Sequence, residues 1–131
     1  MAVGLLLITH DGIGRDLLAT ALSTLGSSPL ETASLSVSQT DEPDAVLARA
    51  IELADAMDDG DGVLVLTDMY GSTPSNIASR LVRERGWRLI AGVNLPMLIR
   101  VLNYSGLGIH ELISKALSGG HDGIMLCDDD D

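Results

Sequence analysis

The sequence predicts an open, doubly wound α/β sheet with mainly parallel strands, in a single domain. Short, uninterrupted apolar runs alternate with stretches in which apolar residues recur at helical spacing. Runs at this spacing indicate right-handed βαβ crossovers, which place helices on both faces of a parallel sheet. The length of 131 residues suits one domain with one core.

The first half of the chain contains two strand and helix units. Residues 3–8 form a continuous apolar run, typical of a strand buried on both faces, and residues 17–25 carry apolar side chains at helical spacing. Residues 32–38 alternate apolar and hydroxyl side chains, the pattern of an edge strand with one wet face. Pro43 starts a second helix that extends to Met57.

The second half repeats this alternation. Strands are predicted at 63–67, 87–93 and 123–127, and helices at 73–86, 94–102 and 109–117. Thr73 suits a helix N-cap and Pro74 the first helical residue. Gly119 and Gly120 separate the last helix from the last strand. The domain therefore spans residues 1–127, and residues 128–131 form a solvated acidic tail.

The composition predicts a soluble protein that does not bind nucleic acid. Nineteen acidic and eight basic residues give a formal charge of −11, which repels phosphate backbones and anionic lipid surfaces. The single Cys127 cannot form an internal disulfide, and the run at 3–8 lacks the length and basic flank of a signal peptide. No run approaches the roughly 20 apolar residues that cross a bilayer. We therefore expect a reduced, cytoplasmic location.

Two strand ends meet where a ligand is expected to bind. In an open α/β sheet, ligands bind beyond the carboxyl ends of the strands, where the strand order reverses. The first strand leads into His10 and the third into Asp68, and an edge position of the second strand makes these two strands neighbours. A carboxylate that accepts the proton of one imidazole nitrogen leaves the other nitrogen free to attack an electrophile. His10 and Asp68 are therefore the candidate catalytic residues.

A candidate phosphate-binding segment, Gly71, Ser72 and Thr73, lies beside them. It leads into a helix whose free backbone N–H groups and positive dipole end favour an anion such as a phosphoryl group. A plainer interpretation stays open, in which His10 is an ordinary loop residue and Asp68 and Thr73 only cap the helix.

Other chemistries lack their motifs. The glycine turn at 12–14 misses the third glycine of a dinucleotide fingerprint, and there is no P-loop. The serine hydrolase elbow is absent, although a hydroxyl near His10 leaves a hydrolase alternative. A receiver-type switch phosphorylated on Asp68 would need an acidic pair for Mg²⁺ and a late lysine. His10 and the absence of a lysine between Glu84 and Ser114 argue against it. His110 and His121 are expected to be exposed and have no metal-ligand spacing, so we expect no metal and no cofactor.

Three segments resemble one family. They read Leu-Ile-Thr-His10-Asp-Gly, Thr-Asp68-Met-Tyr-Gly-Ser-Thr-Pro-Ser-Asn-Ile-Ala-Ser and Ala-Gly-Val-Asn94-Leu-Pro-Met-Leu. In their order and spacing, over nearly the whole length, the chain resembles the mannose-family enzyme IIA component of the bacterial phosphoenolpyruvate:sugar phosphotransferase system.

The resemblance implies a phosphotransferase step in sugar transport. By it, His10 accepts a phosphoryl group from the phosphocarrier HPr and passes it to an enzyme IIB, with a phosphohistidine as the intermediate. Asp68 would orient His10 through Nδ1, which leaves Nε2 as the phosphorylated atom. No metal or nucleotide is required, and membrane association is at most indirect, through the transporter. The family also implies a homodimer, in which the strand at 123–127 lies antiparallel on the partner's sheet as its edge strand.

Four apolar residues are candidates for partner docking: Met69, Tyr70, Leu95 and Met97. Adaptable Met and Tyr side chains suit transient partners, and plain core packing is the alternative interpretation. Two positions depart from the family's pattern. Asp11 stands where a small residue commonly follows the histidine, and the segment 71–73 replaces Gly-Gly-Ser. Because a carboxylate opposes an incoming dianion, we expect Asp11 to alter the rate of transfer and not the ability to accept phosphate.

Two related functions remain as alternatives. The phosphocarrier of dihydroxyacetone kinase shares the fold and the early histidine, although the segment 94–96 favours the mannose type. A regulatory module would carry the same phosphohistidine and report metabolic state to a partner, with no sugar moved. The phosphorylation chemistry of all these proteins is the same, so the sequence does not separate them.

Overall fold

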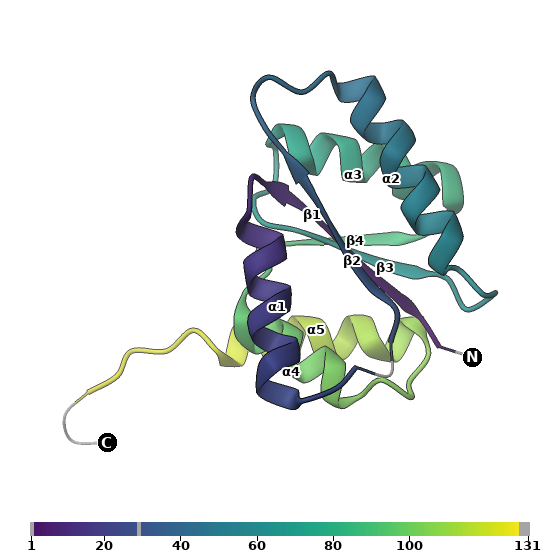
Figure 1. The fold of residues 1–131 in the computed structure, drawn as a ribbon. Coiled ribbons are helices and arrows are strands. Elements are labelled where there is room, and N and C mark those ends of the chain that lie inside the picture. Colours follow the sequence, from purple (N-terminus) through teal and green to yellow (C-terminus); the bar gives the residue numbers. More distant parts are fainter. Residues whose placement is uncertain (1, 29, 129–131) are drawn as a thin grey trace.

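A four-stranded parallel sheet forms the centre of the molecule, which we describe from a computed structural model covering residues 2–28 and 30–128 (Figure 1). The strands are β1 (Gly4–His10), β2 (Thr32–Val37), β3 (Val63–Thr67) and β4 (Arg88–Ala91), in the spatial order β2-β1-β3-β4. The helices are α1 (Ile13–Leu25), α2 (Pro43–Met57), α3 (Thr73–Arg85), α4 (Leu95–Asn103) and α5 (Ile109–Asp122). All three strand pairs are parallel, which confirms the predicted doubly wound sheet.

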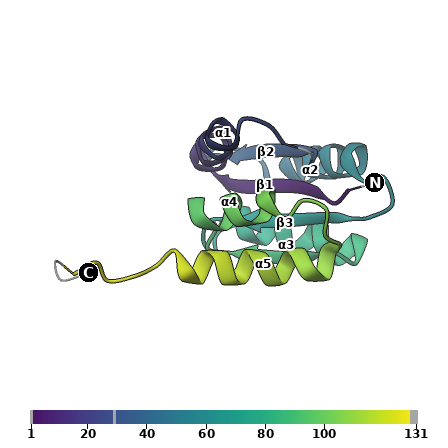
Figure 2. The same cartoon turned by 90° about the horizontal axis from the view of Figure 1, so that it is seen from below.

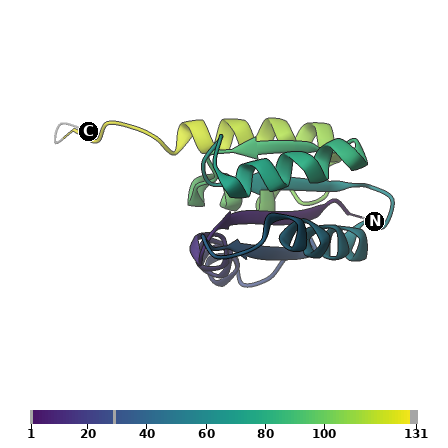
Figure 3. The same ribbon diagram turned by 90° about the horizontal axis from the view of Figure 1, so that it is seen from above.

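Helices cover both faces of the sheet. Figure 1 shows α2 and α3 above the sheet and α1, α4 and α5 below it, and the views in Figures 2 and 3 agree. Alternate residues of the central strands enter the two cores. Leu5 and Leu7 of β1 pack in the cluster with α1, α4 and α5, whereas Leu6 and Ile8 pack in the cluster with α2 and α3. This two-sided burial is why β1 reads as a continuous apolar run.

The sheet topology places the ends of β1 and β3 side by side. β1 pairs with β2 on one side, where Ile8 lies opposite Leu35, and with β3 on the other, where Leu7 lies opposite Leu66. From β1 the chain goes to β2 on one side, and β3 then lies on the other side of β1. The strand order therefore reverses at β1, and its carboxyl end is the switch point of the sheet.

The predicted end of the last helix is wrong. Helix α5 continues through Gly119 and Gly120 to Asp122. At Gly119 an added Cβ would lie 2.5 Å from Cβ of Arg100, and at Gly120 it would lie 2.9 Å from Cε of Met97. The two glycines therefore let α4 and α5 pack closely, and this contact outweighs their low helix propensity.

The segment after α5 forms no strand within this chain, contrary to the prediction for 123–127. Residues 124–128 extend away from the body (Figures 1, 2 and 3) and expose Ile124, Met125 and Leu126. A strand needs a neighbour for its backbone hydrogen bonds, and the segment lies beside none in the single chain. Most of the predicted acidic tail, residues 129–131, lies outside the described residues. Among those that are described, no helix has the length and apolar character needed to span a membrane.

Candidate active site

His10 and Asp68 are in direct contact at the switch point, as their positions in the sequence predicted. His10 is the last residue of β1, and Asp68 directly follows β3. Nδ1 of His10 lies 2.8 Å from Oδ2 of Asp68, and the backbone N–H of His10 donates to the same oxygen at 3.2 Å. Because an ionised carboxylate only accepts, Nδ1 carries the proton and Nε2 keeps its lone pair. The His10 side chain is 37% exposed and that of Asp68 12%, so the ring is accessible while its partner is shielded.

The charge of Asp68 is preserved by its hydrogen bonds. Burial raises the pKa of this carboxyl, but the hydrogen bonds from the ring and the backbone of His10 and from its own backbone N–H, with the attraction of His10, outweigh burial. The net pKa of Asp68 is therefore below its usual value. Asp68 is ionised at neutral pH and stays an acceptor for Nδ1.

The turn before α3 follows Asp68 directly and is held by hydrogen bonds of its own. Gly71 adopts φ +85°, a conformation that favours glycine, and Ser72 is the N-cap, whose Oγ accepts from the N–H of Ser75 at 3.5 Å. The predicted cap was Thr73, one residue too late; Thr73 is instead the first residue of the helix. Asp68 does not cap α3 either, since its Oδ1 accepts from the N–H of Met69 at 3.1 Å.

A cavity of about 450 Å³ lies beside His10. It is lined by residues of the β1–α1 turn, the β2–α2 loop and the start of α3: His10, Asp11, Val37, Ser38, Gln39, Asp41, Pro43, Thr73 and Pro74. Of the predicted phosphate-binding residues, Thr73 lines this cavity. The contribution of the β2–α2 loop was missed, although the pairing of β2 with β1 places its carboxyl end at the same edge of the sheet.

Two carboxylates, those of Asp11 and Asp41, share the cavity with His10. Asp11 has φ +40°, and its N–H donates to the carbonyl of Val37 at 3.0 Å, which ties the β1–α1 turn to the end of β2. Aspartate is one of the few residues that tolerate the left-handed region. The turn therefore holds a negative charge next to the ring.

The candidate docking residues separate into two groups. Met69 and Tyr70 are 58% and 82% exposed beside Asp68, so they are available to a partner. Met97 is 4% exposed and packs in the core below the sheet, which makes its predicted docking role wrong. Met97 lies on the face of α4 that packs against the core, and the sequence around it did not show which face this would be. Leu95 is half-buried against the same core.

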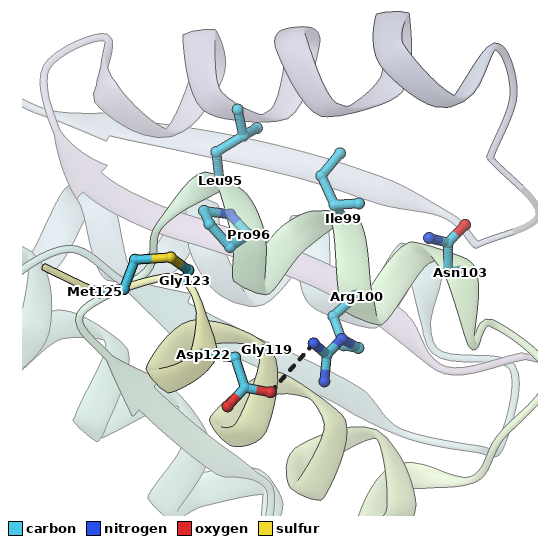
Figure 4. Close-up of a pocket in the computed structure, with 9 residues that line it drawn as sticks. All are labelled: Leu95, Pro96, Ile99, Arg100, Asn103, Gly119, Asp122, Gly123 and Met125. Carbon is cyan, nitrogen blue, oxygen red and sulfur yellow. Dashed lines mark hydrogen bonds and ion pairs between the residues drawn. The ribbon is translucent and has the colours of Figure 1, made fainter. Parts of the chain in front are cut away.

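Leu95 lines a second cavity, of about 490 Å³, between α4 and the end of α5 (Figure 4). Arg100 and Asp122 form an ion pair of 3.3 Å across these two helices. No residue lines both this cavity and the one beside His10. His110 and His121 are exposed on α5, as predicted. Within residues 2–28 and 30–128 there is no group of three or more His, Cys, Asp or Glu side chains that could hold a metal ion.

The fold and the site together define a doubly wound α/β domain with a carboxylate-oriented histidine at the switch point of its sheet. Residues 4–117 match the family model of the PTS system fructose IIA component, EIIA-man. The chain belongs to this family and is a mannose-family IIA phosphocarrier domain of the sugar phosphotransferase system.

Known proteins agree with this assignment. The chain is 31% identical over 136 residues to the PTS system mannose-specific EIIAB component of Escherichia coli, a match that covers 95% of this chain and 39% of the relative. The chain thus spans well under half the length of that relative. It is also 33% identical over 67 residues to the PTS system fructose-specific EIIA component of Bacillus subtilis, across 50% of this chain and 46% of the relative.

The fold has close counterparts among solved structures. The mannose/sorbose specific IIA subunit from Enterococcus faecalis superposes with a TM-score of 0.84 at 24% identity, over 98% of this chain and 96% of that one.

Proposed function

We propose that this chain accepts a phosphoryl group from phosphorylated HPr on Nε2 of His10 and passes it to an enzyme IIB in the cytoplasm. The observation that carries the proposal is the 2.8 Å contact between Nδ1 of His10 and Oδ2 of Asp68. It holds the proton on Nδ1 and leaves a lone pair on Nε2 of a ring that lines an open cavity.

The transfer needs no other nucleophile and no net movement of a proton. The lone pair on Nε2 forms a bond to phosphorus while the bond between phosphorus and the donor atom of HPr breaks, and that bonding pair returns to HPr. Asp68 balances the positive charge that the phosphorylated ring acquires. The second transfer runs the same exchange from Nε2 to the IIB acceptor.

The start of α3 supports the charge on the phosphoryl oxygens. The positive dipole end of α3 and the N–H of Thr73 favour an anion there, whereas Pro74 has no N–H and that of Ser75 donates to Oγ of Ser72. Thr73 adds a hydroxyl at the cavity wall, and Gly71 and Ser72 shape the turn that presents these groups. Met69 and Tyr70, exposed next to Asp68, supply an adaptable apolar surface for both partners.

A homodimer is part of the proposal. Ile124, Met125 and Leu126 are exposed on the extended segment after α5, and β4 ends the sheet without a further strand within the described residues. Exposed apolar residues and an open strand edge favour association, here through antiparallel pairing of this segment with a partner's sheet.

Intact mass spectrometry tests the proposal directly. The natural chain and His10→Ala are incubated with phosphoenolpyruvate, enzyme I and HPr, and each mass is then measured before and after brief acid treatment. We expect one acid-labile phosphoryl adduct on the natural chain and none on the variant. No adduct, or an adduct that persists in His10→Ala, would overturn the proposal.

A further inference from the structure

Three polar residues are buried among those the structure describes, and all three adjoin the candidate site. Thr9 is 1% exposed, Thr67 0% and Ser75 1%. Thr9 directly precedes His10, Thr67 directly precedes Asp68, and Ser75 lies in the first turn of α3. A buried hydroxyl costs free energy unless it is hydrogen-bonded, so the partners of these three hydroxyls, two at strand ends and one in α3, show what each of them holds.

The hydroxyl of Thr9 holds the turn that carries His10. Its Oγ1 accepts from the N–H of Gly14 at 2.8 Å, whereas the N-cap of α1, Gly12, has no side chain to serve as a cap. Thr9 therefore caps α1 from the end of β1. The approach is so close that a Cβ at Gly14 would lie 2.8 Å from this oxygen. The same hydroxyl lies 3.4 Å from the carbonyl oxygen of His10, to which it donates.

The hydroxyls of Thr67 and Ser75 hold the carboxylate of Asp68 and the turn at Gly71. Oγ1 of Thr67 donates to Oδ1 of Asp68 at 3.5 Å, and Oδ1 also accepts the N–H of Met69. With Oδ1 held in this way, Oδ2 points to His10. Oγ of Ser75 accepts the N–H of Gly71 at 3.3 Å and so fixes the turn that leads into α3.

We infer that Thr9, Thr67 and Ser75 are positioning residues for phosphoryl transfer. The hydroxyl of Thr9 holds the segment of the nucleophile, that of Thr67 holds the carboxylate that orients it, and that of Ser75 holds the turn that leads into α3. The inference rests on the proposed function, and it goes further by assigning the rate of transfer to groups that touch neither the phosphoryl group nor a partner. Pre-organisation of this kind lowers the barrier because less reorganisation remains at the moment of reaction.

Paired substitutions test the inference. Thr9→Val and Thr67→Val keep the shape of the side chain and remove the oxygen, whereas Thr9→Ser and Thr67→Ser retain it. We expect each valine variant to be phosphorylated by phosphorylated HPr about tenfold more slowly, the effect of one lost hydrogen bond, and each serine variant to stay within about twofold of the natural rate. Ser75→Ala should show a loss of the same order.

A second measurement separates positioning from stability and needs no phosphoryl donor. The ¹⁵N resonances of the His10 ring report which nitrogen carries the proton, and we expect the share with the proton on Nδ1 to fall in both valine variants. Leu81→Ala is the matched control, because Leu81 is fully buried in the core on the α2 and α3 face. It should lose at least as much stability and keep both the natural rate, measured well below its unfolding temperature, and the natural tautomer.

The outcomes are distinct. The inference is wrong if the valine variants keep the natural rate and tautomer, or if Leu81→Ala slows phosphorylation to the same degree. If Thr9→Val does not fold, Thr67→Val on the neighbouring strand decides the question by the same criteria. A natural chain that accepts no phosphate contradicts the proposed function, and the tautomer measurement still decides whether the hydroxyls orient His10.

Discussion

One oxygen of Asp68 accepts two hydrogen bonds from His10, one from the backbone N–H at 3.2 Å and one from ring Nδ1 at 2.8 Å. The carboxylate therefore holds the end of β1 and the imidazole together. The ring cannot rotate away from Oδ2 without losing the shorter of these bonds, so Nε2 is directed by the same residue that fixes the tautomer.

Asp68→Asn should slow the phosphorylation of His10 by about tenfold to a hundredfold, the effect of a lost charge-assisted hydrogen bond. The amide keeps the size of the side chain but removes the charge that supports the phosphorylated ring. Time courses of the phosphoryl adduct by intact mass give the rate. Asp55→Asn is the matched control, since Asp55 pairs with Arg85 on the surface at 2.8 Å and should leave the rate unchanged. Equal rates for Asp68→Asn and the natural chain would contradict the role of Asp68.

The stability of the protein should depend on the ionisation of Asp68 at acid pH. Because the pKa of Asp68 is lowered by folding, the unfolded chain binds the proton more readily, and stability falls as the pH drops below the unfolded value of about 3.9. Above that value the contribution of Asp68 is fully present. Urea unfolding between pH 6 and pH 2.5, at intervals of about half a unit, should show a shallower acid loss for Asp68→Asn. Parallel curves of unfolding free energy against pH for the two proteins would show that the hydrogen bonds of Asp68 do not stabilise its ionised form in the folded protein.

Removal of the charge at Asp11 should raise the rate of phosphoryl acceptance by about twofold to tenfold, because a carboxylate in the same cavity repels the incoming dianion. Asp11→Asn keeps a residue that tolerates φ +40° and removes only the charge. Asp11→Gly removes the charge and the backbone strain together, so agreement between the two variants assigns the effect to charge. Complete loss of acceptance in either variant would be incompatible with this account.

Gly119→Ala should lower the free energy of unfolding by about 1–2 kcal/mol, after allowance for the better helix propensity of alanine. Its Cβ would meet Cβ of Arg100 at 2.5 Å, a rigid part of α4 that cannot swing aside. Gly106→Ala is the control, since no atom lies within 4 Å of a Cβ at that position. Urea unfolding curves measure both. A Gly119→Ala protein as stable as Gly106→Ala would mean that α4 and α5 do not pack this closely.

The extended segment after α5 should decide the oligomeric state. A chain that ends at Gly123 lacks the exposed Ile124, Met125 and Leu126 and should sediment as a monomer at micromolar concentration. The natural chain, and a chain shortened only by residues 129–131, should sediment as dimers. The proposed homodimer is wrong if all three species have the mass of one chain.

The sequence by itself determined the edge position of β2, the neighbouring positions of β1 and β3, and the meeting of His10 and Asp68. Apolar runs of strand length identify β1 and β3 as buried, and the alternation in β2 identifies an edge strand. These local patterns, together with the handedness of βαβ crossovers, bring His10 and Asp68 to one edge of the sheet. Both residues lie at the ends of paired strands, and this position brings Oδ2 of Asp68 within hydrogen-bond distance of the backbone and the ring of His10.

Tertiary structure decided the features that depend on contacts between distant segments. Gly119 and Gly120 stop a helix by propensity, yet here they continue one because α4 lies against them. Met97 was a candidate for partner docking, but the packing of α4 buries it in the core. Gln39 lines the cavity beside His10 because β2 pairs with β1. A sequence pattern records the preferences of neighbouring residues, whereas close packing and cavities are properties of surfaces that meet only after folding.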